Sequence, residues 1–199
     1  MDAKEKYEKL FSSFGEANLE ELAQMFNCSV DDIYDDDIND ETEGFDSIPY
    51  KIVIGDVDLS GFGNVDDLGE LEVVLGSVNL GQYGKVTPLM DSLGKLKFVY
   101  GDMFCSFNAI EDVSSLIAVG GDANFEECRA NSESNLEYVG GYLALDGSGI
   151  KSAKKLQYVG GDLYLQDSRI HSLDSLEYVG GNIEADDDLE LNFKKGRSR

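Results

Sequence analysis

The sequence Leu136-Glu137-Tyr138-Val139-Gly140-Gly141 recurs at residues 156–161 and 176–181, with one change from Glu to Gln at position 157. A fixed period of 20 residues indicates a solenoid, because so short a unit cannot bury its own apolar side chains and must stack on its neighbours. Weaker copies lie earlier in the same frame. The chain therefore contains seven units, which begin at Gly55, Gly76, Gly101, Gly121, Gly141, Gly161 and Gly181.

Each unit has the pattern of a strand with one buried face. In Gly161-Asp162-Leu163-Tyr164-Leu165-Gln166, apolar residues alternate with polar ones, which is the period of a half-buried strand. The paired glycines suit a sharp turn with positive φ or a close approach of two backbones. The predicted buried pairs are Val57/Leu59, Val78/Leu80, Met103/Cys105, Ala123/Phe125, Leu143/Leu145, Leu163/Leu165 and Ile183/Ala185.

Further positions of the unit complete its apolar lining. A small or polar residue follows the second buried position by three, where it can bond backbone at a turn: Asn108, Cys128, Ser148, Ser168 and Asp188. Ile, Leu and Val then return to the core before the next glycine pair. The unit that begins at Gly76 is longer than the others, and its excess predicts an insertion around residues 88–94.

This pattern, L-x-L-x-x-(N/C/S)-x-I, resembles the leucine-rich repeat, and the Val-Gly-Gly before each strand resembles the coils of receptor L domains. The resemblance covers residues 55–191. It implies a mainly β, right-handed parallel solenoid with coils of about 20 residues. Coils this short leave little room for an outer helix, so we expect strands on one face and turns or short 3₁₀ pieces on the other.

The chain divides into three parts by composition. Residues 1–50 carry fifteen acids and three lysines, and we expect a short α-helical N-terminal cap followed by an acidic loop. Tyr7, Leu10, Phe11 and Phe14 have helical spacing, and Asn18 is placed to cap a second helix. Residues 51–193 form the repeat solenoid, and residues 194–199 form a basic tail that we expect to be disordered.

Charge and cysteine content restrict the partners. A net charge of −24 argues against direct binding of nucleic acid or an anionic membrane and favours a basic partner. No apolar stretch has membrane-spanning length, and the N-terminus does not resemble a signal peptide. Cys28, Cys105 and Cys128 lack metal-ligand spacing and favour a reducing, cytoplasmic location.

The sequence offers little support for a metal site or for DNA binding. Asp35, Asp37, Asn39 and Asp46 have calcium-loop spacing, but Asp40 stands where an EF-hand needs glycine. Residues 56–67 match that template better, yet the repeat itself explains their alternation. Residues 19–33 resemble a fragment of repressor-type helix-turn-helix domains without a basic recognition helix. We predict no bound metal.

No catalytic constellation is evident. His171 is the single histidine, and it lies on a predicted turn without a Cys or metal-type partner nearby in sequence. Two glycine-rich motifs commonly hold phosphate, G-x-x-x-x-G-K-[ST] and, between a strand and a helix, G-x-G-x-x-G. The sequence contains neither. The sequence therefore predicts a protein that is not an enzyme and needs no cofactor.

The candidate binding surface consists of outward strand positions and the acidic segment. Outward residues of successive coils align into a ladder, on which carboxylates surround aromatic side chains. Solvated outer faces explain such residues equally well. The candidates are Asp102, Phe104, Asp122, Asn124, Tyr142, Asp146, Asp162, Tyr164 and Glu184, together with Asp31, Asp32, Asp35, Asp36 and Asp37 of the acidic segment.

These features predict a non-catalytic binding protein. Since basic protein surfaces commonly hold nucleic acid, the favoured hypothesis is an inhibitor of a nucleic-acid-handling protein, such as a phage counter-defence (anti-CRISPR) factor or a toxin-immunity protein. A leucine-rich-repeat adaptor that recognises a peptide or receptor is one alternative. A calcium- or glycan-binding surface repeat is another.

Overall fold

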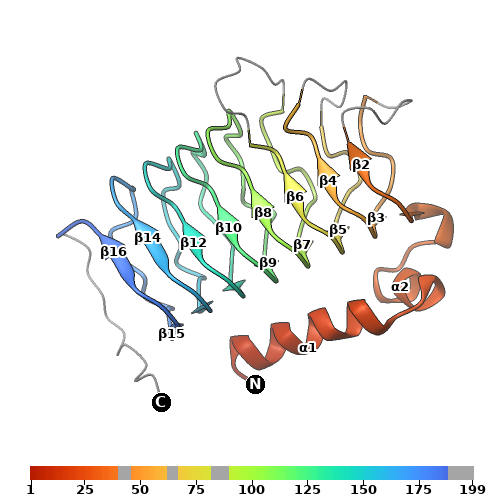
Figure 1. The fold of residues 1–199 in the computed structure, drawn as a ribbon, viewed down its shortest axis with the longest axis horizontal. Helices are drawn as coiled ribbons and strands as arrows, with labels where there is room; N and C mark the ends of the chain where they lie inside the picture. Colours follow the sequence, from red (N-terminus) through yellow and green to blue (C-terminus); the bar gives the residue numbers. More distant parts are fainter. Residues whose placement is uncertain (40–45, 62–66, 82–89, 188–199) are drawn as a thin grey trace.

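The computed structural model describes residues 1–39, 46–61, 67–81 and 90–187 of the chain (Figure 1). It is a mainly β parallel solenoid with helices at the N-terminal end of the chain, as the repeat predicts. Several predicted features lie outside the described residues. They are residues 40–45 of the acidic segment, part of the expected insertion, Asp188 and the basic tail.

Two parallel eight-stranded sheets run along the solenoid, and each coil supplies one strand to each of them. Sheet A contains β1 (Ile33–Tyr34), β3 (Ile52–Val53), β5 (Val73–Val74), β7 (Phe98–Val99), β9 (Ala118–Val119), β11 (Tyr138–Val139), β13 (Tyr158–Val159) and β15 (Tyr178–Val179). Sheet B contains β2 (Ile38–Asn39), β4 (Val57–Asp58), β6 (Val78–Asn79), β8 (Met103–Phe104), β10 (Ala123–Asn124), β12 (Leu143–Ala144), β14 (Leu163–Leu165) and β16 (Ile183–Ala185).

Sheet B is the ladder that the alternating pattern predicts. Leu163 and Leu165 are 0% and 2% exposed, and their neighbours pair in register, for example Leu143 with Leu163. The predicted inward pairs of the preceding coils are buried as well, whereas Ile183 and Ala185 in the last coil are only partly buried. Sheet A was not expected as a second sheet, and it forms from the residues just before the glycine pairs.

Close stacking explains the glycine pairs. A Cβ on Gly160 would overlap the carbonyl oxygen of Gly140, and one on Gly141 would overlap the carboxylate of Asp122. The left-handed glycines of the described chain are Gly69, Gly94 and Gly147, so the pairs do not have positive φ. Of the two reasons that the sequence offered for the glycine pairs, close backbone approach is therefore the correct one.

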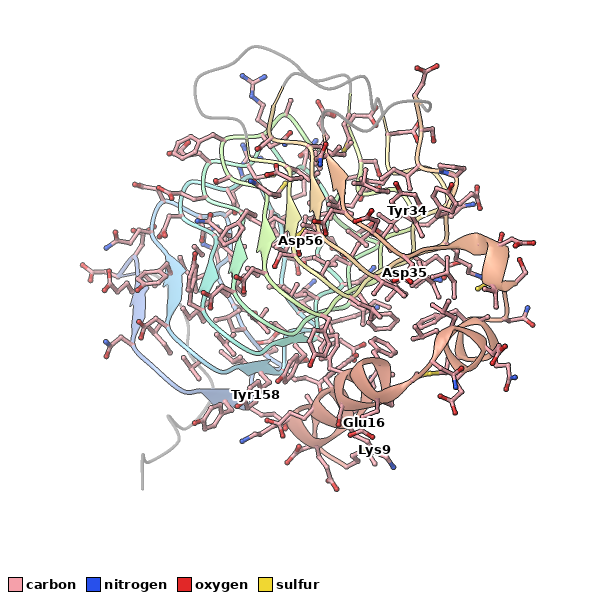
Figure 2. All side chains as sticks on the ribbon, turned by 45° about the vertical axis from the view of Figure 1, so that its right-hand side comes forward. Lys9, Glu16, Tyr34, Asp35, Asp56 and Tyr158 are labelled. Atoms are coloured by element: carbon pink, nitrogen blue, oxygen red, sulfur yellow. The ribbon has the colours of Figure 1, made fainter. Side chains whose placement is uncertain are left out.

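From β1 to β13, sheet A is buried or partly buried on both faces, because its outward row is also apolar; Tyr178 on β15 is 39% exposed. That row comprises Ile33, Ile52, Val73, Phe98, Ala118, Tyr138, Tyr158 and Tyr178. It is covered mainly by α1 (Ala3–Glu16), which runs along the side of the solenoid (Figures 1 and 2). The longer N-terminal helix thus protects a sheet face instead of the apolar end of the solenoid.

Aromatic contacts fix α1 to sheet A. The ring centroids of Tyr7 and Tyr138 are 5.3 Å apart, and those of Phe11 and Tyr100 are 5.8 Å apart. Asp2 caps the helix by accepting the Glu5 N–H at 2.8 Å. The shorter helix α2 (Leu19–Met25) begins with a capping box made by Asn18 and Glu21, as predicted for Asn18.

We expect the attachment of α1 to weaken in strong alkali. Burial raises the pKa of Tyr7 to about 12, and a hydrogen bond to Glu137 adds to this effect. Burial also raises the pKa of Tyr138 to about 12. Because both folded pKa values exceed the ordinary value of 10.0, their contribution to stability is complete below about pH 10 and falls between about pH 10 and 12.

Urea unfolding at pH 8 and pH 11 tests this prediction. Tyr7→Phe removes one of the titrating groups, so the variant should lose less stability between the two pH values than the wild type does. An equal or larger loss in Tyr7→Phe would show that Tyr7 does not contribute to the alkaline transition.

The solenoid begins earlier in the chain than expected. The 3₁₀ helix η1 (Val30–Asp32) leads directly into β1, and β1 and β2 pair in parallel with β3 and β4. Residues 33–39 of the predicted acidic loop therefore supply the first strand of each sheet, ahead of the seven glycine-led units. Asp35, Asp36 and Asp37 occupy the corner that Ile54, Gly55 and Asp56 occupy in the next coil.

Candidate protein-binding face

Two rows of side chains make up the outer face of sheet B, which we call the acidic face. The flank row immediately precedes the strands, and the outer row lies on them. The flank row contains Asp37, Asp56, Ser77, Asp102, Asp122, Tyr142, Asp162 and Asn182. The outer row contains Asn39, Asp58, Asn79, Phe104, Asn124, Ala144, Tyr164 and Glu184.

The carboxylates of the flank row bond the backbone of the following coil. Asp102 Oδ1 accepts the Asp122 N–H at 2.8 Å, and Asp122 Oδ1 accepts the Tyr142 N–H at 2.9 Å. Asp37, Asp56 and Asp162 do the same for Asp56, Ser77 and Asn182, at 2.8, 2.6 and 2.6 Å. These aspartates therefore have a structural role, and the corner glycine of the following coil leaves room for each carboxylate.

Two replacements of Asp122 should distinguish the contribution of its hydrogen bond to stability from the contribution of its charge. Asp122→Ala removes the acceptor of the Tyr142 N–H and should lower the free energy of unfolding by about 1–3 kcal/mol. Asp122→Asn keeps an amide oxygen at the same place and relieves repulsion, so it should cost less than about 1 kcal/mol. Urea denaturation measures both values. If the two variants were equally unstable, the hydrogen bond would not be the stabilising feature.

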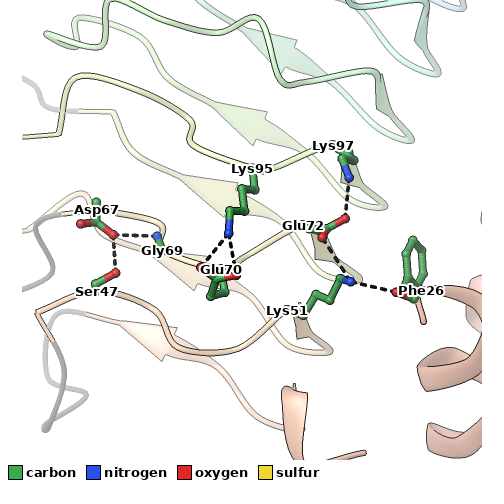
Figure 3. Close-up of polar contacts among 9 residues, drawn as sticks. All are labelled: Phe26, Ser47, Lys51, Asp67, Gly69, Glu70, Glu72, Lys95 and Lys97. Carbon is green, nitrogen blue, oxygen red and sulfur yellow. Dashed lines mark hydrogen bonds and ion pairs between the residues drawn. The ribbon is translucent and has the colours of Figure 1, made fainter. Parts of the chain in front are cut away.

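No lysine or arginine occupies either row in the described coils. The five ion pairs between described residues lie elsewhere, on α1, beside sheet A or on the turns that lead into it. Figure 3 shows three of them, in which Lys51 and Lys97 share Glu72 while Lys95 pairs with Glu70. The basic side chains of Lys51, Lys95 and Lys97 thus offset charge outside the acidic face.

Aromatic side chains interrupt the acidic face at its C-terminal end. The rings of Tyr142 and Tyr164 meet edge to face with centroids 6.3 Å apart, and Tyr164 Oη donates to Asp162 Oδ2 at 3.2 Å. Burial and Asp162 raise the pKa of Tyr164. Phe104 lies three strands away along the outer row and is half-buried, as are both tyrosines.

The structure divides the candidate acidic segment into two parts. Asp35, Asp36 and Asp37 are exposed at the corner next to Asp56, so they extend the acidic face to the first coil (Figure 2). Asp31 and Asp32 lie in η1, before sheet A begins. Asp32 accepts the Ser29 N–H at 2.7 Å, which lowers its pKa, so it closes a local turn.

The remaining candidates adjoin the acidic face. Asp146 follows β12, and its Oδ1 accepts the Gln166 N–H at 2.7 Å. Burial raises the pKa of Asp146, and nearby Asp167 and Asp186 add to this effect. Asn124 accepts the Glu126 N–H at 2.9 Å, and Glu184 is exposed on the last strand.

Other kinds of site have little support among the described residues. They contain no cluster of three or more His, Cys, Asp or Glu side chains that could hold a metal ion. Asp58 of the calcium-like segment accepts the Ser60 N–H at 3.0 Å, which closes a turn. His171 is exposed, and none of the helices in the described ranges is both long and apolar enough to cross a membrane.

Comparison with known proteins gives no further assignment, since no family model, curated protein or solved structure matches the chain.

Proposed function

We propose that this is a non-catalytic protein that binds a basic surface of another protein through the acidic face. The observation that carries the proposal is the segregation of charge, because sheet B presents carboxylates along its length without a described basic side chain between them. Such a field speeds the encounter with a basic partner and disfavours acidic ones.

The geometry of the flank row supports this role. Asp37, Asp56, Asp102 and Asp122 each use one oxygen for the next coil, which leaves a second oxygen for an incoming lysine or arginine, whereas the second oxygen of Asp162 accepts the Tyr164 hydroxyl. Adjacent parallel strands lie about 4.8 Å apart, so the neighbouring Asp37 and Asp56, and likewise Asp102 and Asp122, present fixed charges at that spacing. The backbone bonds hold the carboxylates in place before a partner arrives, which reduces the entropy lost on binding.

The partner that fits best is a nucleic-acid-handling protein. A protein surface built to hold DNA or RNA is basic and complementary to a line of anions. We therefore propose an antagonist that occupies that surface, of the phage counter-defence (anti-CRISPR) or toxin-immunity type. Its three cysteines are free thiols, which suits action in the cytoplasm.

A leucine-rich-repeat adaptor is the second candidate, favoured by the Tyr142–Tyr164 pair. Aromatic side chains supply the buried contact area that anchors a peptide. An adaptor would use the same face but would leave the partner's nucleic-acid site free. The two proposals therefore differ in one measurable property, which is competition with nucleic acid.

Affinity capture with two matched variants tests the proposal. The face variant replaces Asp37, Asp102, Asp122 and Asp162 by Asn, which retains an acceptor for each backbone N–H. The helix variant replaces Glu5, Glu8, Glu16 and Glu20 by Gln and removes the same formal charge. A basic protein retained by the wild type and the helix variant but lost from the face variant would support the proposal. Equal retention by all three would contradict it.

A further inference from the structure

The two described arginines of this acidic chain lie at one hollow. They stand at equivalent turn positions two coils apart, Arg129 after β10 and Arg169 after β14, and Gly149 occupies the same position in the coil between them. The lining of the hollow includes these three residues together with Glu111, Glu127, Asn131 and Gly147. It lies on the turns that follow the strands of sheet B, outside the acidic face.

Gly149 is the reason the hollow exists. A Cβ at this position would overlap the carbonyl oxygen of Ala130, so the stacking of the coils requires glycine there. The same requirement leaves a gap in a row that carries long side chains on both sides. Neighbouring coils are about 4.8 Å apart, so the backbones of Arg129 and Arg169 are separated by roughly 10 Å, which arginine side chains can span from two sides.

Neither arginine has an ion-pair partner among the described residues. Glu127 lines the same hollow, but its carboxylate lies against Gly147, where an added Cβ would approach Oε1 to 2.7 Å. Two guanidinium groups are thus gathered at one place on a chain with a net charge of −24. A planar guanidinium offers paired N–H donors that match the oxygens of a phosphate group.

We propose that this hollow binds a phosphate group, held between Arg129 and Arg169 above Gly149. The Asn131 side chain in the lining supplies a further donor, and Glu111 and Glu127 oppose the bound charge and limit affinity. Free phosphate and a phosphate monoester present the same oxyanion and are distinguished by titrating both. The site is separate from the proposed protein-binding function, because none of its lining residues belongs to the acidic face.

Titration of ¹⁵N-labelled protein with inorganic phosphate, at constant ionic strength set with chloride, tests the proposal. Saturable shifts are expected at the amides of Gly147 and Gly149. Arg129→Ala and Arg169→Ala should each weaken binding at least about tenfold. Arg129→Lys keeps the charge but loses the paired N–H donors of the guanidinium, so it should also weaken phosphate binding. Lys154→Ala removes an exposed base outside the hollow and should have no effect.

Glu127→Gln provides a test of opposite sign, since removal of one of the two opposing carboxylates should tighten binding. A parallel titration with adenosine monophosphate shows whether an ester is preferred to the free ion. Three results would overturn the proposal. The amide shifts could fail to saturate, they could appear at the amides of all the lysines, or they could persist unchanged in both arginine-to-alanine variants. Capture of a basic protein by these variants should remain at the wild-type level.

Discussion

Gly160→Ala is expected to lower the free energy of unfolding by about 3–5 kcal/mol, because the added methyl group would occupy the space of a backbone carbonyl. The Gly140 oxygen that it meets belongs to the preceding coil and cannot move away as a flexible side chain can. Relief requires the two coils to separate. That separation would weaken the backbone hydrogen bonds between the coils, such as the one that the Gly160 N–H donates to the Val139 carbonyl oxygen at 2.9 Å.

Gly15→Ala is the matched control. Gly15 lies in α1, where an added Cβ would be 3.5 Å from the Tyr100 hydroxyl, an ordinary contact. Alanine favours a helix over glycine by about 0.5–1 kcal/mol, so this variant should be as stable as the wild type or more so. Urea denaturation of the two variants compares the same chemical change in two settings. If Gly160→Ala lowered the free energy of unfolding by less than about 1 kcal/mol, the inference that the corners stack closely would be wrong.

Neutralising the acidic face is expected to slow association with the basic partner about 10- to 100-fold at low salt. The face variant removes four charges while keeping four backbone acceptors, so its fold should be retained. Its association rate should also depend less steeply on salt than that of the wild type. Stopped-flow or surface-based kinetics at several ionic strengths measure both effects, with the helix variant as the control for net charge.

Removing the aromatic pair should act on a different step. Tyr142→Ala together with Tyr164→Ala should mainly accelerate dissociation, since buried anchors determine residence time more than encounter rate. If the aromatic variant instead changed association alone, or the face variant changed dissociation alone, the assignment of steering to the carboxylates and docking to the tyrosines would be incorrect.

The sequence predicts sheet B well, because its signal is local and repeated. Alternation around Leu163 and Leu165 identifies the buried side directly, and the period identifies the stacking. It predicts the two N-terminal helices for the same reason, since their spacing and the Asn18 cap are local features. Which surface α1 covers depends on contacts such as that between Tyr7 and Tyr138, more than a hundred residues apart.

Sheet A lacks a comparable signal, because a strand that is buried on both faces shows no alternation. Val73 and Val74 are both fully buried, one beneath the helices and one in the solenoid core. Adjacent apolar pairs before each glycine are the feature from which the second sheet and its helical cover could have been inferred.

The first coil lacks the glycine motif of the other coils for a physical reason. Corner glycines are needed only where a preceding coil approaches, and residues 33–39 have no coil before them. Asp36 therefore stands where Gly55 stands in the next coil, and the motif that identifies the other units is absent. The backbone role of the flank aspartates was missed similarly, because an exposed Asp has the same sequence signature whether or not it accepts a neighbour's N–H.

Competition with nucleic acid tests the central claim most directly. Once a basic partner has been captured, its binding to labelled nucleic acid is measured with increasing amounts of this protein, of the face variant and of the helix variant. Antagonism through the acidic face predicts that the wild type and the helix variant displace the nucleic acid, whereas the face variant does not. Nucleic-acid binding that persists when the partner is saturated with wild-type protein would contradict that claim and favour an adaptor.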